Sequence, residues 1–155
     1  MTIEIGSPAP DFTLKNQHGE DISLSSFRGE SAVVLVFFPF AFSGICTGEL
    51  CEIRDNLADL EGDAGGTTVL AVSCDHFFSN RAFAERDGYT FSILSDFWPH
   101  GDVSRAYGTF NEGAGAPDRG TYVIDREGVV RWKIENGIPD ARSLQEYRAA
   151  LADLA

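Results

Sequence analysis

Apolar residues along this chain group into short segments. In some segments they recur every second residue, as in a strand, and in others about every 3.6 residues, as in a helix. The run from Ala32 to Phe38 is almost wholly apolar and rich in Val and Phe, as in a strand that is covered on both faces. Two stretches alternate apolar and polar residues around turn-forming sequences and predict β-hairpins, one near each end of the chain. The predicted strands are 11–14 and 21–24 in the first hairpin, 32–38, 67–73 and 91–94 in the centre, and 121–124 and 129–134 in the second hairpin.

The segments between these strands show helical spacing instead. A helix is predicted over 46–60, where apolar residues recur at intervals of three or four. The glycine-rich stretch 62–66 ends it, and Ser79 or Asn80 is expected to cap the next helix. The predicted helices are 46–60, 79–86, 103–107 and 143–154.

The order of these elements indicates the fold class. A hairpin is followed by alternating strands and helices, and then by an antiparallel pair and a last helix. This order predicts an α/β protein with a central mixed β-sheet flanked by helices, which is compatible with a thioredoxin-like fold. The 155 residues, of which 43% are hydrophobic, contain no repeat or linker, so a single domain over 1–155 is expected.

The charge of the chain argues against several partners. The formal net charge is −12, which disfavours binding to nucleic acid or to an anionic membrane surface. Such acidity ordinarily makes a surface soluble, and the alternative is a docking face for a basic redox partner. Residues 1–6 lack the basic and apolar regions of a signal peptide, and no apolar stretch approaches the ~20 residues of a membrane span. A cytoplasmic location is therefore expected.

Cys46 stands where the apolar strand 32–38 gives way, through a short loop, to the predicted helix 46–60. The N-terminus of a helix carries partial positive charge and unpaired N–H groups, which favour an anion. A thiol in that place is expected to lose its proton more readily than a free thiol, and the thiolate is the nucleophile. The three cysteines form no disulfide-scaffold pattern, so they are expected to be catalytic or structural thiols.

The residues around Cys46 resemble the active-site signature of peroxiredoxins, which are thiol peroxidases. The spacing is Pro-x-x-x-Ser-x-x-Cys-x-x-Glu, with Ser where many members of the family have Thr. Arg119, just before the predicted strand 121–124, matches the arginine of the family's second motif. The resemblance runs from Pro8 to the last helix and is strongest to the alkyl hydroperoxide reductase E type. The four positions of the first motif are Pro39, Ser43, Cys46 and Glu49.

The resemblance implies a reaction in which the Cys46 thiolate attacks a peroxide. The reaction also needs donors for the charge that spreads over the O–O bond, a fixed cation, and shielding from water. The Cys46 backbone N–H and the Ser43 hydroxyl are the expected donors, and Pro39 is expected to shield the sulfur. Arg119 is the expected cation, held by Glu49 one helical turn after the cysteine. Taken alone, Arg119 could be a loop surface charge and Glu49 a solvated helix residue; the combined pattern favours the site.

Cys51 is a candidate resolving cysteine, because it follows Cys46 by five residues. On an intact helix this spacing gives about 140° of rotation and a rise of about 7.5 Å. The two Cα atoms would then lie roughly 8.7 Å apart, beyond the ~7 Å limit for a disulfide, so the helix would have to unwind. Some peroxiredoxins of the bacterioferritin-comigratory type have a resolving cysteine at this spacing and do unwind there. The alkyl hydroperoxide reductase E type instead resembles one-cysteine enzymes, and the alternative for Cys51 is a small helix residue without a role.

Cys74 ends the predicted strand 67–73 and is expected to be a structural thiol. Cys74 and His76 could suggest a metal pair, but no regular spacing of Cys and His completes a zinc site. No metal is therefore expected, and the resemblance implies no cofactor.

The resemblance implies a cycle with two steps. Hydrogen peroxide or an organic hydroperoxide converts Cys46 to sulfenic acid, which Cys51 or an external thiol then attacks. Thioredoxin, or a mycoredoxin with a low-molecular-weight thiol, is the expected reductant. Similar peroxiredoxins dimerise through loops around the active site, so a homodimer is expected. The aromatic residues expected near its interface are Phe40, Phe42 and Trp98.

Two other functional classes remain as alternatives. A thioredoxin-type thiol–disulfide exchange protein is disfavoured, because the helix starts Cys46-Thr47-Gly48-Glu49 and lacks the Cys-x-x-Cys dithiol. The third class is a binding or chaperone-like module without chemistry. Peroxide consumption that depends on Cys46 would indicate the peroxidase. Disulfide reduction without peroxide consumption would indicate the exchange protein.

Overall fold

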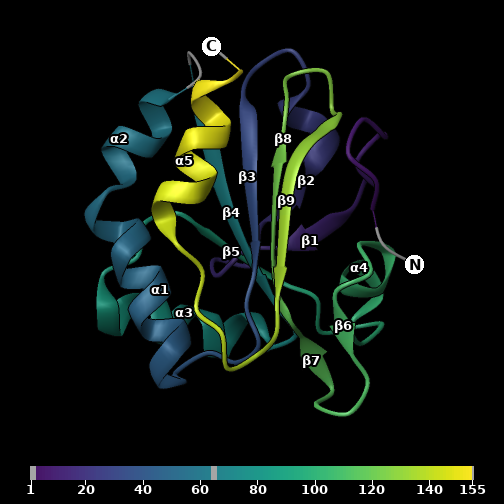
Figure 1. Ribbon diagram of the computed structural model, residues 1–155. Helices are drawn as coiled ribbons and strands as arrows, with labels where there is room; N and C mark the ends of the chain where they lie inside the picture. Colours follow the sequence, from purple (N-terminus) through teal and green to yellow (C-terminus); the bar gives the residue numbers. More distant parts are fainter. Residues whose placement is uncertain (1–2, 64–65, 155) are drawn as a thin grey trace.

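The computed structural model describes residues 3–63 and 66–154, which form a mixed β-sheet with helices on its faces (Figure 1). Within this part of the chain, seven strands form one sheet in the order β2-β1-β5-β4-β3-β8-β9. The sheet strands are β1 (Thr13–Lys15), β2 (Asp21–Ser23), β3 (Ala32–Phe37), β4 (Thr67–Ser73), β5 (Ser92–Ser95), β8 (Arg119–Ile124) and β9 (Val130–Asn136). The helices are η1 (Leu24–Phe27), α1 (Gly44–Asp55), α2 (Leu57–Gly62), α3 (Phe77–Asp87), α4 (Asp102–Ala106) and α5 (Leu144–Ala152).

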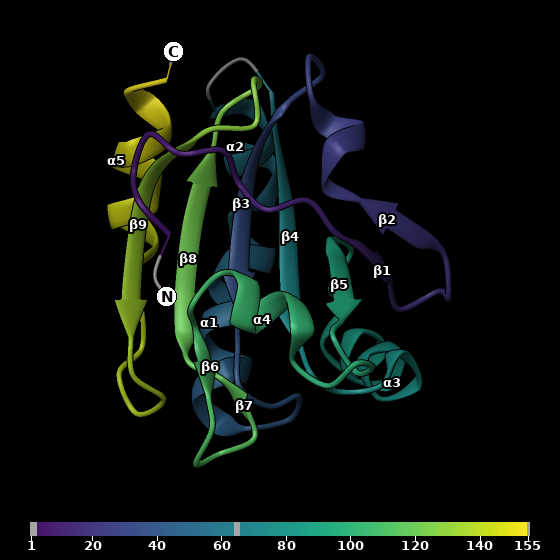
Figure 2. The same cartoon turned by 90° about the vertical axis from the view of Figure 1, so that its right-hand side faces the viewer.

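The strand directions place β3 at the centre of the sheet. β3 pairs in parallel with β4 and antiparallel with β8, and β4 pairs in parallel with β5. The predicted terminal hairpins are present as β1–β2 and β8–β9. Helices α1, α2 and α5 cover one face of the sheet, while α4 lies on the opposite face (Figures 1 and 2). This arrangement confirms the predicted α/β class with a mixed sheet flanked by helices.

The apolar run of β3 is explained by its burial on both faces. Val34 and Val36 belong to the core beneath α1, α3 and α5, together with Cys46 and Phe83. Val33, Leu35 and Phe37 point to the second core, beneath α4, as the period of two in a strand requires. Every residue of β3 is buried. The end of β3 is consequently fixed on both sides, and the loop to α1 starts from a rigid position.

The predicted helix 46–60 is wrong in its bounds. Helix α1 begins at Gly44, two residues before Cys46, because the chain enters the helix at Ser43 as N-cap. The helix then breaks at Asn56, whose side-chain amide donates a hydrogen bond of 2.8 Å to Glu52 O. Asn side chains compete with the helix for backbone groups in this way. Two helices, α1 and α2, therefore take the place of one.

The predicted cap of α3 is also wrong. The helix begins at Phe77, and His76 precedes it as N-cap, with Nδ1 accepting a hydrogen bond of 3.2 Å from Phe78 N. Ser79 and Asn80 lie inside the first turns. A short hairpin of β6 (Phe110–Asn111) and β7 (Ala116–Pro117) was not predicted, because two-residue strands show no alternation. In the described residues no helix has the length and apolar character that a membrane span requires.

Candidate active site

Cys46 lies fully buried in the first turn of α1. The Ser43 hydroxyl oxygen accepts a hydrogen bond of 3.4 Å from the Cys46 backbone N–H. This bond differs from the expectation that the N–H is free for a peroxide, because a serine N-cap satisfies one of the unpaired donors of the helix. The proton of the Ser43 hydroxyl remains available as a donor. Pro39 is buried in the loop directly after β3.

The loop between β3 and α1 is held from the neighbouring strand. Ala41 N donates a hydrogen bond of 2.8 Å to the Asp75 carboxylate, which follows the end of β4. Phe42 has a φ of 70°, a left-handed backbone conformation that is uncommon for residues other than glycine. Its ring packs on Phe83 of α3, with ring centroids 5.1 Å apart. The turn that delivers the chain to Ser43 and Cys46 is thus fixed by contacts with β4 and α3.

Arg119 contacts both the sulfur and the carboxylate. As the first residue of β8 it is 1% exposed, and its Nη1 donates to Cys46 Sγ at 3.2 Å. The same nitrogen donates to Glu49 Oε1 at 2.5 Å, and Nε donates to Ile138 O at 2.6 Å. A permanently charged guanidinium therefore lies against the thiol in a site that is largely closed to solvent. The geometry brings together Cys46, Glu49 and Arg119 as the sequence predicted.

Arg142 is a component of this site that the sequence analysis missed. It lies in the segment between β9 and α5, is 6% exposed, and binds the Glu49 carboxylate through the Nε–Nη2 edge of its guanidinium. Its Nε donates to Glu49 Oε2 and its Nη2 to Oε1, both at 2.9 Å, while its backbone N donates to Oε2 at 2.7 Å. Its Nη1 donates to the carbonyl oxygens of Phe37 and Gly120. Arg142 has no local sequence signature, since it meets Glu49 from 93 positions away.

Glu49 is consequently a buried carboxylate between two guanidinium groups. Burial by itself would raise the pKa of Glu49. The hydrogen bonds and charge of Arg142, together with the charge of Arg119, outweigh burial and hold this pKa below its usual value. Glu49 therefore stays ionised at neutral pH and fixes both arginines by charge-assisted hydrogen bonds.

The other two cysteines have different surroundings. Cys51 is half-buried on α1, with its Sγ 3.4 Å from the Tyr89 hydroxyl, and all three cysteines are free thiols. Burial, followed by the negative charge of Asp96, raises the pKa of Cys74 to about 12. A thiol in that state is a poor nucleophile, which agrees with a structural role for Cys74. Among the described residues, no group of three or more His, Cys, Asp or Glu side chains could hold a metal ion.

The entrance to the site is a pocket of about 270 Å³ with predominantly apolar walls. It is lined by Phe40, Ser43, Gly44, Ile45, Arg119, Ile138 and Pro139. Phe40 and Ile45 are 42% and 41% exposed, so the rim presents apolar surface to solvent. An apolar wall beside a buried guanidinium can accept a molecule with an alkyl part and a polar reacting end.

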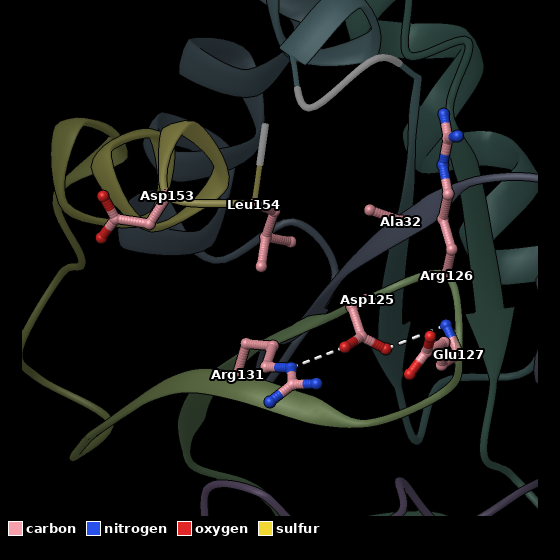
Figure 3. Close-up of a pocket in the computed structure, with 7 residues that line it drawn as sticks. All are labelled: Ala32, Asp125, Arg126, Glu127, Arg131, Asp153 and Leu154. Carbon is pink, nitrogen blue, oxygen red and sulfur yellow. Dashed lines mark hydrogen bonds and ion pairs between the residues drawn. The ribbon is translucent and has the colours of Figure 1, made fainter.

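A second pocket, of about 340 Å³, lies at the opposite end of β8, between the β8–β9 turn and the end of α5 (Figure 3). Two of the charged residues that line it, Asp125 and Arg131, form an ion pair with each other. The Asp125 carboxylate accepts hydrogen bonds from Arg131 Nε at 2.6 Å and from Glu127 N at 2.9 Å (Figure 3). No cysteine lines this pocket. This larger pocket therefore offers no thiol for the chemistry that the sequence predicts.

Known proteins share both the sequence and the fold of this chain. The AhpC/TSA family model matches residues 5–133. Alkyl hydroperoxide reductase E of Mycobacterium tuberculosis is 45% identical over 152 residues, which cover 98% of each chain. Peroxiredoxin Q, chloroplastic, of Triticum aestivum is 35% identical over 98% of this chain and 68% of its own length. The mitochondrial 2-Cys peroxiredoxin of Plasmodium falciparum superposes with a TM-score of 0.84 at 26% identity, covering 97% of this chain and 94% of its own.

Proposed function

Since the chain belongs to the AhpC/TSA family and is a peroxiredoxin, a thiol-dependent peroxidase, we propose that Cys46 is the thiol that reacts with peroxide. The observation that carries this assignment is the position of Arg119, whose Nη1 contacts both Cys46 Sγ and Glu49 Oε1. A fixed cation beside a buried sulfur stabilises the thiolate that attack requires. Cys74, the other buried thiol, has a strongly raised pKa, and no cation of the described residues is among the groups that influence it.

The proposed first step is a displacement at oxygen. The Cys46 thiolate attacks one peroxide oxygen, the S–O bond forms and the O–O bond breaks. The leaving oxygen takes a proton and departs as water or an alcohol, while Cys46 becomes a sulfenic acid. Arg119 and the Ser43 hydroxyl are the proposed donors to the peroxide oxygens, which carry the developing charge. Glu49 acts as a positioning residue because it holds Arg119, and Arg142 acts as one because it holds Glu49.

The proposed substrates are hydrogen peroxide and organic hydroperoxides. The apolar rim formed by Phe40 and Ile45 supports the organic class, because it can cover an alkyl group while Arg119 meets the peroxide. The relative that is 45% identical is named an alkyl hydroperoxide reductase, which agrees with this choice. Thioredoxin, or a mycoredoxin with a low-molecular-weight thiol, is the proposed source of electrons.

The second step of the proposed cycle is attack of Cys51 on the sulfenic acid, with an external thiol as the alternative. The experiment is intact-protein and peptide mass spectrometry after one equivalent of peroxide. We expect a transient gain of about 16 mass units on Cys46, followed by a loss of about two relative to the reduced protein, located to Cys46 and Cys51. A gain of 16 that persists until an outside thiol is added would reject Cys51 as the resolving residue. Oxygen appearing on another cysteine first would reject Cys46 as the peroxide-reactive thiol.

We also propose that the chain forms a homodimer through the loops beside the site. Phe40, Phe42 and Trp98 are 42%, 45% and 81% exposed, which is unusual for aromatic residues of this size. Small-angle scattering at micromolar concentration should therefore give twice the mass of one chain. Phe40→Ser should shift the distribution toward the monomer, whereas Ile5→Ser, at a residue that is 57% exposed in the N-terminal segment, should not. A monomer at all concentrations would contradict this proposal.

A further inference from the structure

Tyr89 connects the end of α3 to the helix that carries Cys46. It follows Gly88, the left-handed C-cap of α3, and is 5% exposed. Its ring packs against Phe83 and Phe91, with ring centroids 5.1 Å and 5.3 Å away. This packing aims the hydroxyl at α1, where the Tyr89 oxygen lies 3.2 Å from Thr47 O and 3.4 Å from Cys51 Sγ.

The chemistry of these groups fixes the direction of both hydrogen bonds. A carbonyl oxygen can only accept, so the hydroxyl proton of Tyr89 goes to Thr47 O. The Tyr89 oxygen must then accept from the Cys51 thiol. Burial raises the pKa of Tyr89, so its hydroxyl keeps the proton at neutral pH. In the intact helix the Cys51 sulfur is thus held against Tyr89 by a hydrogen bond that must break before Cys51 can approach Cys46.

The two partners of Tyr89 are the ends of one helical turn. Thr47 directly follows Cys46, and Cys51 lies four residues further along α1. A disulfide between Cys46 and Cys51 requires this turn to unwind, because the spacing on an intact helix is too long. The end of α3 also contacts the same turn through Arg86, whose Nη2 donates to Thr47 Oγ1 at 3.2 Å. Arg86 is exposed, so the buried bonds of Tyr89 are the stronger restraint.

We propose that Tyr89 is a positioning residue that delays the attack of Cys51 on Cys46. The two hydrogen bonds of its hydroxyl, to Thr47 O and to Cys51 Sγ, act as a latch that keeps the first turns of α1 wound. This proposal rests on the proposed function. The delayed step is Cys46–SOH + Cys51–SH → Cys46–S–S–Cys51 + H₂O. The S–S bond forms as the S–O bond breaks, and the hydroxyl group leaves as water with the thiol proton of Cys51. The latch lengthens the life of the sulfenic acid, during which an external thiol can reach Cys46.

The test is Tyr89→Phe in the full-length protein, which keeps the ring and its packing but removes both hydrogen bonds of the hydroxyl. Rapid-quench mass spectrometry after one equivalent of hydrogen peroxide separates oxygen gain on Cys46 from its conversion to the disulfide. The variant should leave the first rate unchanged and raise the second roughly tenfold, because two hydrogen bonds of ordinary strength no longer oppose unwinding. The acceleration is expected whether unwinding or sulfur attack limits the step, since losing both hydrogen bonds raises the rate of unwinding as well as the unwound fraction.

Tyr107→Phe is the matched control. It also removes a tyrosine hydroxyl bond, of 2.7 Å to Pro10 O, but on the other face of the sheet. A second readout is the rate at which iodoacetamide alkylates Cys51 in reduced protein with Cys46→Ser. Tyr89→Phe should increase that rate by a similar factor, and Tyr107→Phe should not.

The outcomes separate the latch from the proposed function. Normal oxygen gain on Cys46 with an unchanged second rate in Tyr89→Phe would overturn the latch alone. Equal acceleration by Tyr107→Phe would also overturn it, because the cause would then be global destabilisation. Absence of disulfide in both the natural protein and Tyr89→Phe would overturn it as well. Failure of Cys46 to gain oxygen in any variant would overturn the proposed function, and the latch with it.

Discussion

Replacement of Cys46 by serine should lower peroxide turnover by at least about 1,000-fold, to the background of the assay. Serine has nearly the same shape and fits the fully buried position at the start of α1. Its hydroxyl, however, does not ionise at neutral pH, so no nucleophile remains beside Arg119. Consumption of hydrogen peroxide with dithiothreitol as reductant measures the effect.

Cys74→Ser is the control for that experiment. Cys74 is also a buried thiol, but its pKa is raised to about 12, so its removal should leave turnover within about twofold of the natural protein. Equal activity in Cys46→Ser and the natural protein would reject the mechanism. Loss of activity in both variants, with unchanged circular dichroism spectra, would show that turnover requires Cys74 as well as Cys46.

Arg142→Met should lower turnover roughly 100-fold and the free energy of unfolding by about 3 to 5 kcal/mol. Arg142 makes three hydrogen bonds to Glu49 and three more to the backbone and side chains of β3 and β8. Without it, Arg119 alone faces the buried carboxylate of Glu49, and the position of Arg119 relative to the sulfur is no longer fixed. Peroxide kinetics and urea unfolding measure the two losses.

The loss of stability should depend on pH with a definite sign. The pKa of Glu49 is lower in the folded protein than in the unfolded chain, so its stabilising contribution is present above the unfolded value and disappears as pH falls through the folded value. The difference between Arg142→Met and the natural protein should therefore shrink below about pH 4. A difference that is independent of pH would indicate lost packing instead of a lost ion pair.

Two further variants separate the contribution of the buried Glu49–Arg142 ion pair from the loss of an arginine as such. Arg148→Met removes a partly exposed arginine of α5 whose ion pair with Asp63 measures 3.1 Å, and it should cost no more than about 1 kcal/mol. Adding Glu49→Gln to Arg142→Met removes the charge that lost its partner, and should restore part of the stability without restoring turnover. Restored turnover in that double variant would contradict the positioning role of Glu49.

The part of the site that could be predicted is the part that depends on short spacing. Ser43, Cys46 and Glu49 lie within the first turns of one helix, so their distances follow from helical geometry. Arg119 was found through the resemblance to peroxiredoxins, because it comes from a strand far along the chain. Arg142 has no comparable signature. Its role depends on a loop that folds back onto the carboxylate, and only the packed structure defines that path.

The fold shows the same division between local and non-local information. β3 and β4 were predicted closely because they are almost wholly buried and contain unbroken apolar runs, over 32–37 in β3 and 69–72 in β4. Helix ends were less well predicted, since they depend on single side chains. The break at Asn56 comes from its own amide. Helix α3 starts at Phe77 with His76 as an unusual N-cap, although Ser79 is a better N-cap residue by preference. The contact of Tyr89 with Cys51 joins the end of α3 to α1, and it likewise could not be predicted from the spacing of apolar residues.

The hydrogen bonds from Arg142 to Glu49 can form only late in the synthesis of the protein. Synthesis proceeds from the N-terminus, so Cys46, Glu49 and Arg119 leave the ribosome before Arg142 and α5. Until that last segment docks, Glu49 has a single buried cation and β3 and β8 lack the guanidinium that joins their ends. In a nascent chain the reactive Cys46 would thus lie in a site that still lacks Arg142. Competence for peroxide should arise in one late event during biosynthesis, after the C-terminal helix has packed onto the sheet.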